Sequence, residues 1–98
     1  MVASPKINLS SKVQASKDQV SSDLSGEIAV LQLEEGMYYG ITGAGTFVWK
    51  QIQSGARSVR DLKEEILRNF EVDEARCERD LLKILNQFSD AGLLRIQE

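Results

Sequence analysis

A predicted hairpin in the first half of the chain restricts the folds open to this sequence. Residues 28–33 are mostly apolar and include β-branched side chains, and residues 37–41 contain two adjacent tyrosines. Side chains of both kinds favour strands. The connecting segment Glu34-Glu35-Gly36 ends in a glycine, and a left-handed glycine is typical of the last position of a three-residue hairpin loop. We therefore predict two antiparallel strands joined by this turn.

The predicted turn determines which residues face each other across the hairpin. It sets Leu33 opposite Met37, Leu31 opposite Tyr39, and Ala29 opposite Ile41. One face of the hairpin is then continuously apolar. The other face is mixed, and it carries Ile28, Val30, Gln32, Tyr38 and Gly40. Because Tyr38 combines an aromatic ring with a polar tip, its place on this outer face suits an interface.

Three helices are predicted after the hairpin, each with a recognisable start. The expected N-terminal caps are Thr42, Ser58 and Asp73. Gly55 is expected to end the first helix, and Gly92 the third. Apolar residues recur at helical spacing in all three segments. The aromatic residues assigned to the core are Phe47, Trp49 and Tyr39, and the residues expected to close the chain against it are Leu93, Leu94 and Ile96.

The N-terminal segment has few large apolar side chains. Residues 1–18 are therefore expected to form a weakly ordered arm, and residues 19–24 an edge strand. The remaining chain, residues 19–98, is expected to be one domain. Strands followed by helices give an α+β fold, here a three-stranded antiparallel sheet followed by a three-helix bundle.

Charge and composition exclude several classes of function. Twelve Lys and Arg against fifteen Asp and Glu give a net charge of -3, which supplies no long-range attraction to nucleic acid. The chain has no His and one Cys, so a His-rich metal site, a CxxC pair and an internal disulfide are excluded, and we expect no metal and no cofactor. The apolar runs fall far short of the roughly 20 residues of a membrane span. We expect a cytoplasmic protein that does not bind membranes.

No group of residues in the sequence has the pattern of a catalytic site. Cys77 lies on the apolar stripe of the third helix, and no His is present to activate it, so we interpret it as a buried thiol. The glycines Gly40, Gly43 and Gly45 match neither phosphate-binding motif and are assigned to close strand-to-helix packing. We therefore expect a protein without enzymatic activity.

One flank of the third helix suggests a binding role instead. The polar residues Arg76, Asp80, Lys83 and Gln87 fall within about 60° of one another beside the apolar stripe. A solvated flank is one interpretation. If this flank lies next to the open edge of the hairpin, the two form a groove that captures an extended peptide by strand addition.

The order and spacing of several short motifs give the sequence a resemblance to a known family. The motifs are Gly26-Glu27-Ile28-Ala29-Val30-Leu31, Glu35-Gly36-Met37-Tyr38-Tyr39-Gly40-Ile41-Thr42, Gly45 with Val48-Trp49, Val59 and Leu62, Asp80-Leu81, Leu85, and Gly92-Leu93-Leu94. Together they resemble the PqqD-like proteins, the recognition elements of ribosomally made, modified peptide (RiPP) pathways. The spacing from Gly45 to Trp49 is most similar to the stand-alone proteins of the lasso-peptide branch. Thr42 stands where the family commonly has Asn.

The resemblance implies a fold related to winged helices, in which a precursor's leader adds as an antiparallel strand beside residues 37–41 and against residues 73–91. It also implies delivery of the leader to a maturation protease of the same pathway. Leaders of this branch tend to carry a Tyr and a Pro, and the Tyr is expected in an apolar pocket. The peptide-binding residues expected on these grounds are Leu33, Met37, Tyr38, Tyr39, Gly40, Ile41, Arg76, Asp80, Leu81, Lys83, Ile84 and Gln87.

The sequence leaves two alternative functions open, each from a different class of protein. A winged-helix DNA-binding domain would read bases with the third helix, but the charged residues counted on that helix are three positive and four negative. A dimerising accessory subunit would use the open strand edge to pair with itself. The sequence leaves the oligomeric state open.

Overall fold

The computed structural model describes residues 7–97 and has two small antiparallel sheets and three helices. The elements are β1 (Lys12–Ala15), β2 (Gln19–Asp23), β3 (Glu27–Gln32), β4 (Met37–Thr42), α1 (Ala44–Gln53), β5 (Arg57–Ser58), α2 (Val59–Asn69), α3 (Glu74–Asp90) and β6 (Leu94–Gln97). The predicted α+β class is confirmed, and the expected three-stranded sheet has the order β2-β3-β4. A second sheet, β5-β1-β6, was not predicted.

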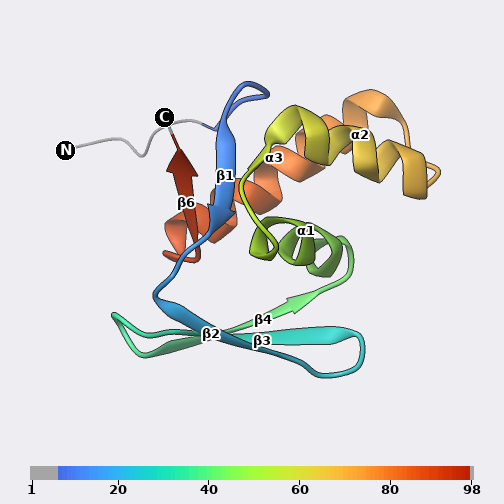
Figure 1. Cartoon of the computed structure of the whole chain (residues 1–98). Helices are drawn as coiled ribbons and strands as arrows, with labels where there is room; N and C mark the ends of the chain where they lie inside the picture. Colours follow the sequence, from blue (N-terminus) through green and yellow to red (C-terminus); the bar gives the residue numbers. More distant parts are fainter. Residues whose placement is uncertain (1–6, 98) are drawn as a thin grey trace.

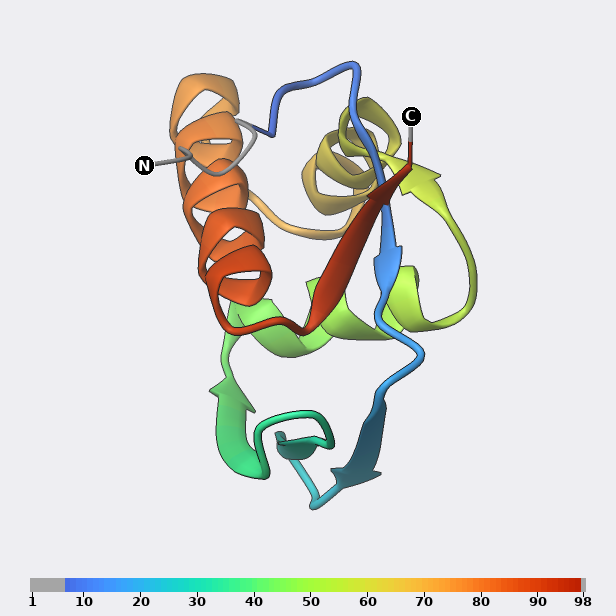
Figure 2. The same ribbon diagram turned by 90° about the vertical axis from the view of Figure 1, so that its left-hand side faces the viewer.

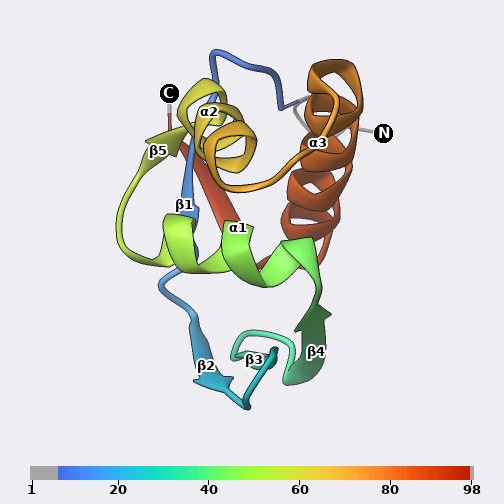
Figure 3. The same ribbon diagram turned by 90° about the vertical axis from the view of Figure 1, so that its right-hand side faces the viewer.

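Helix α1 lies between the two sheets (Figure 1). It covers one face of β2-β3-β4, and on its other side it contacts β1. Helices α2 and α3 contact each other above α1, and α3 also contacts β6. The views in Figures 2 and 3 agree that β4 lies on the side of α3 and β2 on the opposite side. The two edges of the β2-β3-β4 sheet, which we call the lower sheet, therefore have different surroundings.

The core lies around α1, as the sequence predicts. Trp49 is 0% exposed and packs edge-to-face on Phe88, with their ring centroids 5.6 Å apart. Cys77 is buried, which confirms the interpretation of its thiol. Val48, Ile52, Leu62, Leu81, Leu85 and Leu93 complete the centre of the core. Within residues 7–97, no helix has the length and apolar character that a membrane span requires.

The register of the hairpin differs from the prediction by one residue. Gln32 pairs with Met37, so the turn has four residues rather than three. Because side chains alternate along a strand, this slip moves every residue of β3 to the opposite face. Ile28 and Val30, predicted on the outer face, are buried against α1, whereas Leu31 lies on the outer face. The assignment of Tyr38 to the outer face stands, since its side chain is 73% exposed.

The expectation of a weakly ordered arm is wrong for the described part of residues 1–18. Strand β1 pairs along its whole length with β6, and Val13 at its centre is fully buried. Ile7 is buried as well. The first six residues of the expected arm lie outside the described residues. The chain ends thus contribute a sheet that local patterns did not reveal.

Two of the three predicted helix caps are confirmed. The Ser58 hydroxyl accepts a hydrogen bond from the Asp61 backbone N–H at 3.1 Å, and Asp73 accepts one from the Arg76 N–H at 3.1 Å. Thr42 does not cap α1, because it is still part of β4 and pairs with Glu27. Gly43, with a φ of 61°, turns the chain into α1 instead.

Candidate functional site

The edge of β4 is the structural starting point of the candidate site. Among the described residues, β4 pairs with β3 on one side and with no strand on the other. In an antiparallel sheet, alternate residues of an edge strand direct their N–H and C=O groups outward. This edge lies on the side of the molecule where α3 stands (Figures 2 and 3). It is therefore available to a further strand, with a helix as the adjoining wall.

A cavity of about 280 Å³ lies between the edge of β4 and α3. Its lining residues are Gly40, Ile41 and Thr42 from β4, Ala44 and Gly45 from α1, and Ile84, Gln87 and Phe88 from α3. Close packing at Gly45 positions these walls, since a Cβ there would lie only 3.0 Å from the Ile41 side chain. The cavity thus follows the carboxyl-terminal half of β4.

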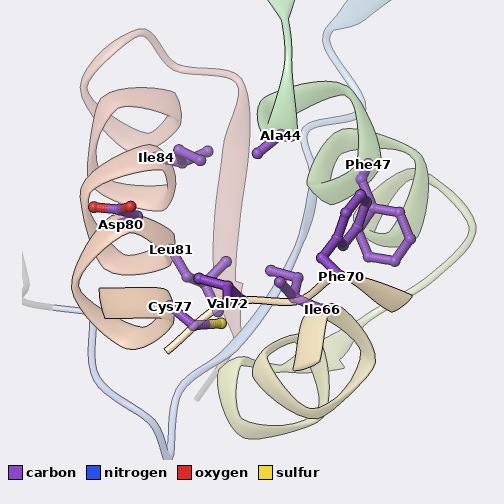
Figure 4. A pocket seen from close by; sticks show the side chains of 9 residues that line it. All are labelled: Ala44, Phe47, Ile66, Phe70, Val72, Cys77, Asp80, Leu81 and Ile84. Carbon is purple, nitrogen blue, oxygen red and sulfur yellow. The ribbon is translucent and has the colours of Figure 1, made fainter. Parts of the chain in front are cut away.

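A second, more apolar cavity of about 190 Å³, which we call the helical cavity, lies between the three helices (Figure 4). Its lining residues are Ala44, Phe47, Ile66, Phe70, Val72, Cys77, Asp80, Leu81 and Ile84. Ala44 and Ile84 line both cavities, so the two adjoin. A cavity of roughly 150 Å³ holds a benzene ring, and the helical cavity therefore has room for one aromatic side chain.

Contacts between the helices hold the walls of the helical cavity in place. The rings of Phe47 and Phe70 pack edge-to-face with their centroids 5.3 Å apart, which joins α1 to the end of α2. The Lys63 ammonium group lies 3.1 Å from a Glu74 carboxylate oxygen and 3.0 Å from one of Glu78, which joins α2 to α3. The two carboxylates raise the pKa of Lys63 above its ordinary value.

The chemistry of the helical cavity is apolar, and Figure 4 shows the carboxylate of its one charged lining residue pointing away from the other lining side chains. Asp80 is the charged residue among the lining residues; its side chain is 54% exposed and lies 3.6 Å from the Arg76 guanidinium group. Burial raises the pKa of the Cys77 thiol, so the neutral thiol prevails at neutral pH and acts as part of the apolar wall. Residues 7–97 contain no cluster of three or more residues suited to holding a metal ion.

The structure brings six of the predicted peptide-binding residues together along the two cavities. They are Gly40, Ile41, Asp80, Leu81, Ile84 and Gln87. Met37 and Tyr38 lie on β4 with exposed side chains, outside the cavity linings. Arg76 and Lys83 are exposed on α3 and line neither cavity.

Two residues expected in the apolar pocket lie elsewhere. The four-residue turn places Leu33 beyond the end of β3, where it is 52% exposed. Tyr39 is partly buried and packs against the core rather than lining a cavity. The sequence prediction also missed the cavity walls from α1 and α2, in particular Ala44 and Phe70. Phe70 follows Ile66 at helical spacing, so the sequence pattern assigned it to the second helix and gave no signal of a cavity, whereas in the structure it is the residue after α2.

A comparison with known protein families identifies the family of this chain. Residues 27–94 match the family described as Coenzyme PQQ synthesis protein D (PqqD). The chain belongs to the PqqD family. A comparison with curated protein sequences gives no match.

Two solved structures are similar to this PqqD-family chain over most of their length. TbiB1 in complex with the TbiA(beta) leader peptide has 27% sequence identity and a TM-score of 0.78, with 84% of this chain and 94% of that chain covered. A lasso peptide synthetase B1 complexed with the leader peptide has 14% identity and a TM-score of 0.73, with 85% and 96% covered. The second likeness concerns the fold alone.

Proposed function

We propose that this PqqD-family protein recognises the leader region of a ribosomally synthesised, lasso-type precursor peptide. The leader adds as an antiparallel strand along β4, with α3 as the second wall, and the protein presents the bound precursor to a maturation protease. The observation that carries the proposal is the junction of an open strand edge with two adjoining cavities. The likeness to TbiB1, which was solved with a leader peptide, supports it.

Backbone and side-chain contacts have separate roles in this proposal. The outward N–H and C=O groups of β4 bind any extended backbone, so they supply affinity with little selectivity. The cavities select particular side chains. An apolar cavity of this size suits an aromatic ring, and the family resemblance leads us to expect a tyrosine there.

The direction of the bound strand follows from antiparallel pairing. Strand β4 runs from Met37 to Thr42, and both cavities lie at its Thr42 end. An antiparallel partner runs the opposite way, so its amino-terminal part lies at the cavities. The anchoring side chain therefore precedes the strand-forming segment of the leader, and the peptide leaves the site near Met37.

The role proposed for the protein is binding without catalysis. The one thiol is buried, with a raised pKa, and the sequence has no His to act as its base. The isolated protein mixed with precursor is expected to leave the precursor's mass unchanged. Cleavage or loss of water without a partner enzyme contradicts this part of the proposal.

Blocking the junction of the cavities tests the site directly. Ala44 lines both cavities and is exposed, so Ala44→Phe should fill the junction without disturbing the core. Calorimetric titration with a synthetic leader is expected to show affinity lowered by about ten-fold or more, a change of about 1.4 kcal/mol in binding free energy. The matched control is Ala75→Phe, which adds the same ring to an exposed position of α3 outside both linings. Equal affinities for the two folded variants contradict the assignment.

A further inference from the structure

Exposed apolar side chains are concentrated at one end of the lower sheet. Six large hydrophobic residues are exposed among the described residues, and four of them lie at the end where β3 turns into β4. They are Val20, Leu33, Met37 and Tyr38, which we name the exit surface. Isolated exposed apolar residues are ordinary, whereas several gathered at one end of a sheet indicate an interaction site.

The exit surface includes the outer face of the sheet, which no described element covers. Val20 pairs with Leu31, and Leu31 pairs with Tyr38, so these three form one row across the sheet. This row faces away from α1, because the neighbouring row contains the buried Gln32. Met37 pairs with Gln32, so its side chain lies on the opposite face of the sheet, at the same end. Figure 1 shows α1 above the sheet and no helix below it.

The exit surface lies where the proposed peptide leaves the site. An antiparallel strand along β4 passes the cavities first and Met37 last, so the segment that follows the leader emerges beside Leu33 and Tyr38. An enzyme that cuts shortly after the bound strand approaches the same end of the sheet. The added strand also widens the sheet, so that an enzyme docked on Tyr38 touches the peptide next to it.

Charges around the exit surface indicate the chemistry of its partner. Glu34 and Glu35 occupy the β3–β4 turn, and Asp18 lies beside it, where its carbonyl accepts the Leu33 N–H at 2.9 Å. Lys17 precedes Asp18, so the surroundings carry three carboxylates and one ammonium group. Two copies paired through this surface would bring like charges together, which disfavours self-association. A partner whose surface has an apolar centre and a basic rim would be complementary to the exit surface.

From these observations we infer that the exit surface is the docking site of the protease that removes the leader, and that the protease meets it with an apolar patch bordered by Lys or Arg. The inference rests on the proposed function, because the path of the leader places the scissile segment there.

Matched leucine variants at opposite ends of the sheet test the inference. Leu33 and Leu24 are 52% and 55% exposed, but Leu24 lies at the β2–β3 end, away from the exit surface. The probe is the purified protease acting on a precursor with a fluorophore and a quencher on either side of the cleavage site. Leu33→Glu is expected to lower the cleavage rate by about ten-fold, with leader affinity within about two-fold of wild type. Leu24→Glu is expected to match wild type in both measurements.

A second pair of variants separates the apolar and the charged parts of the docking site. Val20→Glu changes the same surface from β2 and is expected to slow cleavage as Leu33→Glu does. Glu34→Lys with Glu35→Lys is expected to slow cleavage and to reduce its dependence on salt, because complementary charges at the rim speed association.

Several outcomes overturn the inference. These are cleavage at the wild-type rate with folded Leu33→Glu and Val20→Glu, an equal loss with Leu24→Glu, or a dimer in sedimentation that Leu33→Glu converts to a monomer. A loss of leader affinity in Leu33→Glu also overturns it, since the surface would then belong to the leader site. Failure of the proposed function is distinguishable, because the wild-type protein would then bind no leader at all.

Discussion

The contribution of individual residues is clearest at Trp49. Its indole ring is enclosed by the core and contacts Phe88, yet its Nε1 has no hydrogen-bond partner within residues 7–97. A buried donor without a partner lowers stability, so the residue stabilises the fold through packing alone. The sequence predicted this role correctly from helical spacing, because Trp49 lies on the inward stripe of a single helix.

Trp49→Ala is expected to unfold the protein or nearly so. Replacing a buried Trp by Ala costs about 3 to 5 kcal/mol, against the roughly 5 to 15 kcal/mol of a whole domain. Urea denaturation followed by circular dichroism measures the loss. Trp49→Phe keeps a ring and removes the unpartnered N–H, so it should cost much less. A Trp49→Ala variant that melts as wild type but has lost leader binding would place Trp49 in the site instead of the core.

Cys77 offers a native probe of the helical cavity. Only the thiolate reacts with disulfide reagents, and burial raises the pKa of this thiol. At a given pH the thiolate fraction is therefore smaller than for a free cysteine, and the onset of labelling should shift to more alkaline pH. Saturating leader should slow labelling further, by about ten-fold or more, if a side chain fills the cavity. Labelling that is as fast as for free cysteine, or unaffected by leader, contradicts the assignment of the cavity.

Local signals predicted some elements well and others not. The caps of α2 and α3 depend on residues three apart in the sequence, so Ser58 and Asp73 were recognisable. The hairpin register failed because it was derived from a three-residue turn ending at Gly36, whereas Gln32 pairs with Met37 and the turn has four residues. Gln32 is polar but buried, and its Oε1 accepts the Glu35 N–H at 2.6 Å within this turn. The longer turn therefore places the other face of β3 against the core.

The pairing of β1 with β6 was beyond local signals. These strands lie at opposite ends of the chain, and each has only four residues. Val13 and Ala15 alternate with polar neighbours, but so short a strand is not stable until it pairs with β6 from the other end of the chain. The long-range pairing, rather than the propensity of residues 12–15, orders the expected arm.

A proline in β4 tests whether its edge binds a peptide backbone. Gly40→Pro removes a backbone N–H, whereas Gly40→Ala keeps it and adds a Cβ whose nearest neighbour, the Glu27 carboxylate, is 3.9 Å away. Leader affinity is expected to fall by about ten-fold or more in the proline variant and to stay within about two-fold in the alanine variant. A folded Gly40→Pro protein that binds leader as tightly as wild type would remove edge pairing at this position.

For the whole molecule, the sequence predicted the strand edge and the helix of the site but not the helical cavity. The edge of β4 and the facing residues of α3 were expected, since each belongs to one element with a visible pattern. The helical cavity depends on Ala44, Phe47 and Phe70, which meet only when α1 and α2 pack together. No spacing within either helix predicts that contact, because it arises from tertiary structure.

The two edges of the lower sheet provide an internal control for the central claim, which is strand addition along β4. Amide hydrogen exchange of the intact protein, read residue by residue by NMR with and without synthetic leader, compares β4 with β2 in one sample. With leader bound, the edge amides of β4 are expected to exchange at least about ten-fold more slowly, while the edge amides of β2 are unchanged. Protection confined to β2, or absent from both edges while the leader is bound, would contradict it.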